Sequence, residues 1–176
     1  MIDEMDVKIL AILQQDCTRP VAEIGREVGL STTPCWRRIQ QLEANGVIRS
    51  RVAVLDPLAV NAGVTVFVSI KTDQHSLAWL EKFHAAARDF PEIVEFYRMS
   101  GDVDYLLRVV VPDIAAYDGF YKRLIERIDI SKVSSAFAME QIKYTTALPL
   151  RYALPQKAAK SRARSKSASS DTDDVR

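Results

Sequence analysis

Residues 31–42 (STTPCWRRIQQL) contain the side chains best suited to recognising another molecule. An apolar stripe at Cys35, Ile39 and Leu42 has the i, i+4, i+7 spacing of a helix face that packs into a core. The opposite face carries hydroxyl, guanidinium and amide groups, which hydrogen-bond to base edges and phosphates. We expect Thr32, Thr33, Trp36, Arg37 and Gln40 to lie nearest the bases of double-stranded DNA, with Ser31 and Arg38 on phosphates.

The sequence on either side of this helix predicts the elements that would position it. Residues 3–15 carry a helical apolar stripe, and the acidic residues in their first turn suit a helix N-terminus. A second short helix is expected between Pro20 and Gly29. Ser31 is placed to cap the third helix, which ends at about Ala44. Three short helices with a tight turn before the last predict a helix-turn-helix unit whose third helix enters the major groove.

Residues 47–54 (VIRSRVAV) alternate enough to predict a strand after the helices. Such a strand would form a wing, with Arg49 and Arg51 projecting to one side. Residues 56–63 contain a proline and a glycine, and the pattern of the chain changes after them. We therefore expect a domain boundary there.

The remainder of the ordered chain predicts a second domain of mixed helices and strands. Strands are expected at residues 64–71, 93–99, 103–111 and 133–143, with helices beginning at Ser76 and Asp113. This βαββαβ order is typical of a ferredoxin-like fold, in which helices cover one face of an antiparallel sheet. The other face also needs a cover, and we expect a symmetric dimer to supply it. The predicted fold class is thus α+β.

The composition is that of a soluble globular protein, with 48% hydrophobic and 27% charged residues. The net charge of +1 does not distinguish a nucleic-acid-binding protein from any other. Cys17 and Cys35, with no signal peptide before them, predict a reducing, cytoplasmic location. Neither cysteine has a second ligand nearby, and Cys35 lies on the apolar stripe, so no metal site is expected. We also expect no cofactor and no membrane span.

The predicted organisation has four parts. Residues 1–52 form the helix-turn-helix domain, residues 53–63 a linker strand, residues 64–150 the ferredoxin-like domain, and residues 151–176 a tail. The tail is rich in alanine, serine, lysine and arginine, with little to bury, so we expect it to be disordered. A solvated tail is favoured over a basic arm that adds salt-sensitive phosphate contacts.

The order of the two domains resembles the Lrp/AsnC family of bacterial transcription regulators over residues 1 to about 150. The resemblance rests on Gly29-Leu30-Ser31, on Thr33-Pro34-Cys35, on Arg38 with Leu42-Glu43, and on residues 100–107 (SGDVDYLL). It implies homodimers that assemble further, commonly to octamers, with amino-acid effectors bound between subunits of the second domain. Residues 13–18, 32–36 and 137–146 resemble the cysteine-responsive, DecR-like subgroup of that family, which implies L-cysteine as effector.

By itself, the segment at Gly101 is most simply a tight turn. The resemblance turns it into a candidate effector site. Backbone N–H groups around Gly101 would hold a carboxylate, and Asp102 or Asp104 would meet an ammonium group. Side chains shaping the rest of the site would be Met99 and Tyr105 with Ser135, Ala136, Phe137 and Met139 of a neighbouring subunit.

Two other function classes fit parts of this pattern. Some haem-pathway decarboxylases share the two-domain architecture, but they need a large anion pocket lined by His and Arg, and the sequence offers no such constellation. An amino-acid-binding oligomeric module without DNA function would not need the polar face of residues 31–42. We therefore expect no catalytic residues, and a sequence-specific, amino-acid-responsive regulator of amino-acid metabolism genes.

Overall fold

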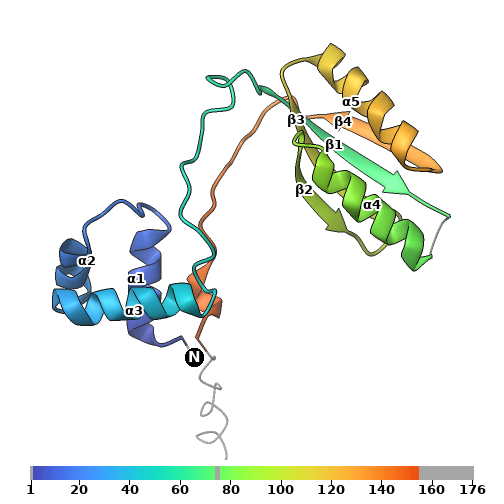
Figure 1. Ribbon diagram of the computed structural model, residues 1–176. Helices are drawn as coiled ribbons and strands as arrows, with labels where there is room; N and C mark the ends of the chain where they lie inside the picture. Colours follow the sequence, from blue (N-terminus) through green and yellow to red (C-terminus); the bar gives the residue numbers. More distant parts are fainter. Residues whose placement is uncertain (1, 74–75, 155–176) are drawn as a thin grey trace, which may run out of the picture. The chain divides into compact units, whose positions relative to one another are not determined.

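The computed structural model describes residues 2–73 and 76–154 and divides the chain into two compact units (Figure 1). Of the described residues, 2–52 and 145–154 form the helical unit, and 53–73 and 76–144 form the sheet unit. Most of the predicted tail, residues 155–176, lies outside the described residues. The chain passes from the helical unit into the sheet unit and then returns.

Three helices form the helical unit: α1 (Glu4–Leu13), α2 (Val21–Val28) and α3 (Thr32–Ala44). The predicted helix-turn-helix is confirmed. Helix α1 begins with a capping box, in which the Asp3 carboxylate accepts from the Asp6 backbone N–H at 2.8 Å and the Asp6 carboxylate accepts from the Asp3 N–H at 3.1 Å. The apolar stripes of the helices meet in one core: Ile9, Leu10, Leu13, Ile24, Val28, Cys35, Ile39 and Leu42.

The predicted strand at residues 47–54 is wrong. All eight residues are described, and none is in a strand. A strand needs a neighbour for its backbone N–H and C=O groups, and the sequence supplies a single alternating run here without a second one to pair with it. Val52 and Val54 are 70% and 60% exposed, so alternation alone does not bury a face. The expected linker strand at residues 53–63 is likewise absent, and these described residues form no strand.

The sheet unit has the predicted βαββαβ order. Its elements are β1 (Val64–Lys71), α4 (Leu77–Asp89), β2 (Ile93–Arg98), β3 (Tyr105–Val111), α5 (Ile114–Arg127) and β4 (Lys132–Phe137). Every strand pairing is antiparallel, and the sheet order is β2-β3-β1-β4. Ser76 and Asp113 cap the two helices as predicted, each accepting from a backbone N–H three residues later. This is the ferredoxin-like arrangement.

Both helices of the sheet unit cover the same face of the sheet (Figure 1). Val66, Val68 and Ile70 of β1 alternate towards the helices, where they pack with Phe83 of α4 and Phe120 of α5. These five side chains are fully buried. Burial of side chains of this size contributes about 1.5–3 kcal/mol each, so this layer holds the unit together.

The opposite face of the sheet is partly open. Phe67 and Tyr97 are 40% and 49% exposed there, and Leu106 lies beside them in the register. Arg108 and Glu95 form an ion pair at 2.7 Å, and the Tyr97 hydroxyl donates to the same carboxylate at 2.9 Å. Burial raises the pKa of Glu95, but these two partners outweigh burial and hold its pKa below the usual range. The face therefore has an apolar part beside a neutralised charge pair.

Strand β4 ends at Phe137, although the sequence predicted a strand to residue 143. Pairing stops because β1, its partner, begins at Val64, and the last bond of this ladder runs from the Ala138 N–H to the Thr65 carbonyl. The side chains that follow have nothing to pack on: Met139 is 97% exposed and Ile142 90%.

The chain then rejoins the helical unit through residues 145–154, which we call the return segment. The Gln14 side chain, just after α1, makes two hydrogen bonds to the backbone of Leu148, donating to its carbonyl at 3.1 Å and accepting from its N–H at 3.0 Å. Leu150, at the start of a short 3-10 helix (Leu150–Tyr152), packs against the helical core. No local sequence pattern signals this docking, because the two partners are 134 residues apart.

Candidate DNA interface and effector hairpin

Helix α3 separates a buried face from an exposed one, as its sequence predicted. Cys35, Ile39 and Leu42 are at most 4% exposed. The other face presents the five residues expected nearest the bases, and all of them are exposed: Thr32, Thr33, Trp36, Arg37 and Gln40. Trp36 is 51% exposed and is not part of the helical core. The structure thus brings the five together on one solvent-facing surface of α3.

The turn before α3 is held by a close backbone approach. The Leu30 N–H donates to the Gly25 carbonyl at 2.8 Å. A Cβ on Gly25 would lie only 2.8 Å from the Leu30 carbonyl oxygen and 3.4 Å from Cβ of Cys35. Only glycine fits here without a shift, so Gly25 fixes how closely α2 approaches the start of α3. Ser31 occupies the N-cap position, but its hydroxyl makes no capping bond.

Arg38 lies between the two faces and points to α1. Its Nη1 donates to Asp3 at 2.7 Å and to Asp6 at 2.8 Å. The Asp3 pKa is lowered, mainly because its carboxylate accepts from the Asp6 backbone N–H and then because of Arg38. The same two carboxylates raise the pKa of Arg38. The predicted phosphate contact of Arg38 would have to compete with these ion pairs, which already tie α3 to the start of α1.

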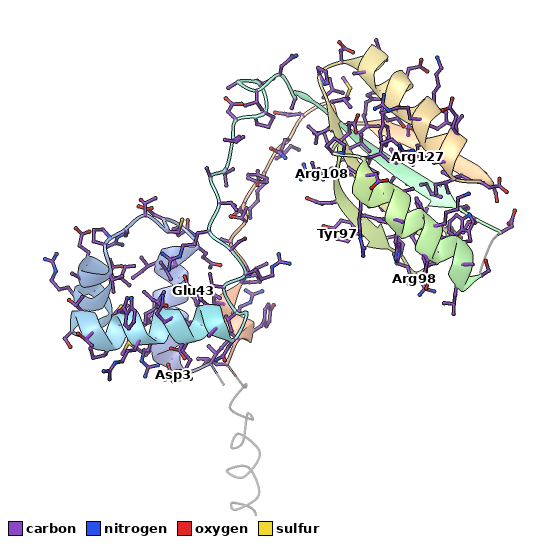
Figure 2. The ribbon with its side chains drawn as sticks, in the orientation of Figure 1. Asp3, Glu43, Tyr97, Arg98, Arg108 and Arg127 are labelled. Atoms are coloured by element: carbon purple, nitrogen blue, oxygen red, sulfur yellow. The ribbon has the colours of Figure 1, made fainter. Side chains whose placement is uncertain are left out.

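Three further side chains of the helical unit meet near the end of α3. Gln40 Nε2 donates to Glu43 Oε2 at 2.9 Å, and Arg51 Nη2 donates to Glu43 Oε1 at 2.6 Å. Glu43 is marked in Figure 2. The sequence placed Arg51 on a wing, but the structure assigns it to this carboxylate.

The cysteines match their structural interpretation. Cys35 is fully buried, and burial raises the pKa of its thiol, which disfavours the reactive thiolate. Cys17 is partly exposed, in the loop before α2. Within the described ranges, no group of three His, Cys, Asp or Glu side chains is arranged to hold a metal ion.

The predicted effector hairpin joins β2 to β3. Gly101 has a φ of +115°, in a region that side-chain-bearing residues rarely adopt. The Asp104 N–H donates to the Ile70 carbonyl at 3.0 Å, and Asp104 Oδ2 accepts from the Thr72 N–H at 2.8 Å. Asp104 therefore clamps the hairpin to the end of β1, and its carboxylate is already engaged. Asp102, in contrast, is exposed.

The other predicted effector residues are divided between surfaces. Tyr105 is 6% exposed, with its ring edge-on to Phe83 at 5.1 Å, so it belongs to the core of its own subunit. On β4, Ser135 hydrogen-bonds to the Tyr117 hydroxyl and Phe137 packs edge-on against the Tyr117 ring, so both face the helices.

Ala136, between them, faces the open side of the sheet beside Phe67. Met99 and Met139 are both exposed. Met99 belongs to the hairpin, where its N–H donates to the Asp104 carbonyl at 2.8 Å. Within a single chain, the residues predicted on and after β4 do not join it there.

Family models and relatives match both units. The AsnC-type helix-turn-helix domain matches residues 2–43, and the Lrp/AsnC ligand binding domain matches residues 65–148. The DNA-binding transcriptional activator DecR of Escherichia coli K12 is 49% identical over 85% of this chain and 99% of its own length. The glutamate uptake regulatory protein of Zymomonas mobilis is 48% identical over 85% of this chain and 91% of its own length.

Solved structures give the same result. An AsnC family transcriptional regulator from Agrobacterium tumefaciens is 69% identical, with a TM-score of 0.85 over 87% of this chain and all of that one. The complex of the transcriptional regulator NMB0573 with L-Met, from Neisseria meningitidis, is 34% identical, with a TM-score of 0.83 over 88% of this chain and all of that one. In the part of the chain that is described, no helix is long and apolar enough to cross a bilayer.

Proposed function

Because this chain belongs to the Lrp/AsnC family of DNA-binding transcriptional regulators, we propose that it controls genes of amino-acid metabolism in response to a small amino acid. The DNA-reading element is α3. The observation that carries this assignment is the exposed row Thr32, Thr33, Trp36, Arg37 and Gln40 on a helix whose other face is fully buried. Paired α3 helices of a dimer would enter successive major grooves of a near-palindromic site, with Ser31 at the phosphate edge.

The effector site is proposed at the Gly101 hairpin. The relative NMB0573 is described in complex with L-Met, which supports an amino acid as the ligand class. Backbone N–H groups around Gly101 would hold the carboxylate. Since Asp104 is committed to Thr72, the exposed Asp102 is the better partner for the ammonium group. Met99 and residues 135–139 of a neighbouring subunit would enclose the side chain, with L-cysteine as the first candidate.

The open face of the sheet supports a proposal for assembly. Its exposed Phe67 and Tyr97 would pair with the same face of a second copy in a symmetric dimer. Dimers would then assemble further, to an octamer or a similar ring, so that the hairpin of one dimer approaches β4 of the next. An effector bound there would change the spacing of the α3 helices and thereby couple the two sites.

The same fold could carry an enzyme, but the charged side chains do not support one. A decarboxylase of this architecture would need His and Arg converging on an anionic substrate. His84 instead packs edge-on against Phe96 at 5.4 Å, in the sheet unit. The relatives cited above are transcriptional regulators, which favours a regulator without catalytic residues or a cofactor.

A mobility-shift assay with the full-length protein and the DNA upstream of its own gene tests the proposed function. We expect a retarded complex at nanomolar protein that survives an excess of unrelated duplex, since specific sites bind about 10³–10⁷-fold tighter than other DNA. Equal competition by related and unrelated duplexes would reject sequence-specific binding. Cysteine, methionine and glutamate are then added separately, and the effector must change the retained fraction.

Replacing Gly101 with valine is expected to abolish the effector response while leaving DNA binding intact. A valine at a φ of +115° adds about 1–3 kcal/mol of strain and displaces the backbone N–H groups of the hairpin. The measurement is the shift in melting temperature on adding each amino acid, because a ligand of the native state raises apparent stability. Ser100→Ala, at the neighbouring position, serves as the control and should keep the shift. An undiminished shift in Gly101→Val would place the effector elsewhere.

A further inference from the structure

Gln40, Glu43 and Arg51 form a hydrogen-bonded chain that determines which end of the Gln40 amide faces outward from α3. Gln40 lies on the exposed face of α3, and its amide nitrogen Nε2 is 2.9 Å from Glu43 Oε2. Glu43 is held in turn from its other oxygen by Arg51 at 2.6 Å, and the two side chains are 33% and 40% exposed. Glu43 is thus restrained from both sides before any DNA is bound.

The orientation of the Gln40 amide follows from the chemistry of its partner. A carboxylate only accepts hydrogen bonds, so the amide must turn its NH₂ group towards Glu43. Its oxygen, Oε1, is then the end left free. A glutamine that can rotate offers either end to a base, but this one presents an acceptor.

In the major groove an acceptor discriminates between two classes of base. Adenine and cytosine present exocyclic amines, N6 and N4, whereas guanine and thymine present the carbonyl oxygens O6 and O4. An outward Oε1 accepts from an amine and repels a carbonyl oxygen. The amide N–H that does not bond to Glu43 lies beside Oε1 and can donate to adenine N7 while Oε1 accepts from N6, so adenine gains a bidentate contact. Guanine cannot make this pair, because its O6 would face Oε1 when the N–H meets N7.

We propose that Glu43 is a positioning residue that orients Gln40, so that α3 selects adenine or cytosine over guanine or thymine at the base that Gln40 faces. This inference rests on the proposed entry of α3 into the major groove. Arg51 has a separate part in it. With α3 in the groove, the Glu43 carboxylate would repel the DNA phosphates, and the Arg51 guanidinium bonded to it would offset that charge.

The test is selection of binding sites from a random-sequence duplex library by full-length wild-type protein, Gln40→Ala and Glu43→Gln. In the wild type, one position of each half-site is expected to favour adenine or cytosine by about tenfold. Gln40→Ala should lose the preference at that position only. Glu43→Gln should reduce it to about twofold or less, because a glutamine at 43 both donates and accepts and releases the orientation of Gln40.

Glu27→Gln is the matched control. Glu27 of α2 pairs with Arg19, in the loop before that helix, at 2.7 Å. The variant therefore removes the same charge and breaks a similar surface ion pair without touching Gln40. It should keep the wild-type preference. If the selected adenine is replaced by purine, which lacks the N6 amine, wild-type affinity should fall about tenfold while Glu43→Gln changes little.

Three results would overturn the inference. The first is a Gln40-dependent preference for guanine or thymine, and the second is a preference that survives in Glu43→Gln. The third is that wild type and Gln40→Ala select the same sequences. In that case the protein still binds DNA specifically, and only the proposed role of Gln40 and Glu43 is removed. If the wild type enriches no sequence at all, the proposed function fails together with the inference.

Discussion

Replacing Arg37 with methionine is expected to lower the affinity of the full-length protein for its selected DNA sites by about tenfold per half-site. Arg37 is exposed on the outer face of α3, where its guanidinium can reach base edges or phosphates. Methionine keeps the length and the apolar stem of the side chain and removes the charge. The melting temperature should stay within about 1 °C of wild type, because surface substitutions of this kind rarely exceed about 0.5 kcal/mol.

The same substitution one residue later should have the opposite profile. Arg38→Met removes the partner of Asp3 and Asp6, and the Asp6 side chain is only 12% exposed. Leaving this carboxylate without its cation is expected to cost the helical unit about 1–3 kcal/mol. Thermal unfolding and a DNA titration are measured on both variants. Arg37→Met should lose DNA affinity and keep its stability, whereas Arg38→Met should lose stability. If Arg38→Met loses DNA affinity at unchanged stability, Arg38 is a phosphate contact rather than a tie between helices.

The ion pairs of Arg38 also predict a dependence on pH. The folded-state pKa of Asp3 lies below its ordinary value of 3.8, so Asp3 contributes stability above that pH. The contribution is lost as the pH falls through the lowered pKa. The hydrogen bond from the Asp6 backbone N–H is the main cause of the lowered pKa, and Arg38→Met retains it. Both proteins should therefore lose stability as the pH falls below about 4, and the wild type should lose slightly more because it also loses the ion pair with Arg38. A steeper loss in Arg38→Met would contradict the assignment.

Truncation after Tyr144 is expected to destabilise the DNA-binding helices, whereas truncation after Leu154 should leave them unchanged. The shorter chain loses both hydrogen bonds between Gln14 and Leu148 and the packing of Leu150 on the helical core. Together these contacts contribute about 2–4 kcal/mol. Hydrogen exchange is measured on peptides from α1 and on peptides from the sheet unit, so that the stability of each unit is reported separately. The α1 peptides should lose protection although α1 is far from the deletion in sequence, and the peptides of the sheet unit should keep theirs.

A point variant keeps this prediction testable if the truncated chain does not fold. Gln14→Leu removes both bonds to the Leu148 backbone, and we expect a loss of about 1 kcal/mol because the site is exposed. Gln15→Leu, at the exposed neighbouring position, is the control and should behave as wild type. Equal protection of α1 in Gln14→Leu and Gln15→Leu would show that the return segment does not support the helices.

The helices and strands of both units could be predicted from the sequence wherever an apolar or alternating pattern packs or pairs with another element of the fold. The stripe on α3 and the alternation of β1 each specify a buried face, and the structure confirms both. Residues 47–54 show a similar alternation but have no neighbouring strand, and β4 stops where β1 no longer offers backbone groups. Local pattern predicts the ability to pair, while pairing itself depends on residues far along the chain.

The candidate sites show the same division. The exposed face of α3 follows from helical spacing alone, so its residues were predictable. The ion pairs of Arg38 with α1 and the docking of Leu148 on Gln14 join residues more than 30 positions apart, and a helical period does not encode them. On β4, a one-residue alternation decides that Ser135 and Phe137 face the helices and that Ala136 does not.

The return segment has a consequence for the order in which the protein is made. Helix α1 is among the first residues to leave the ribosome, but its contact with Leu148 forms only after a further 134 residues have been added. At about 5–20 residues per second, this delay is on the order of 10 s. During that time the whole sheet unit emerges and can fold. The helical unit therefore gains its contact with the return segment only after the sheet unit, through which we propose that copies of the chain assemble, has emerged.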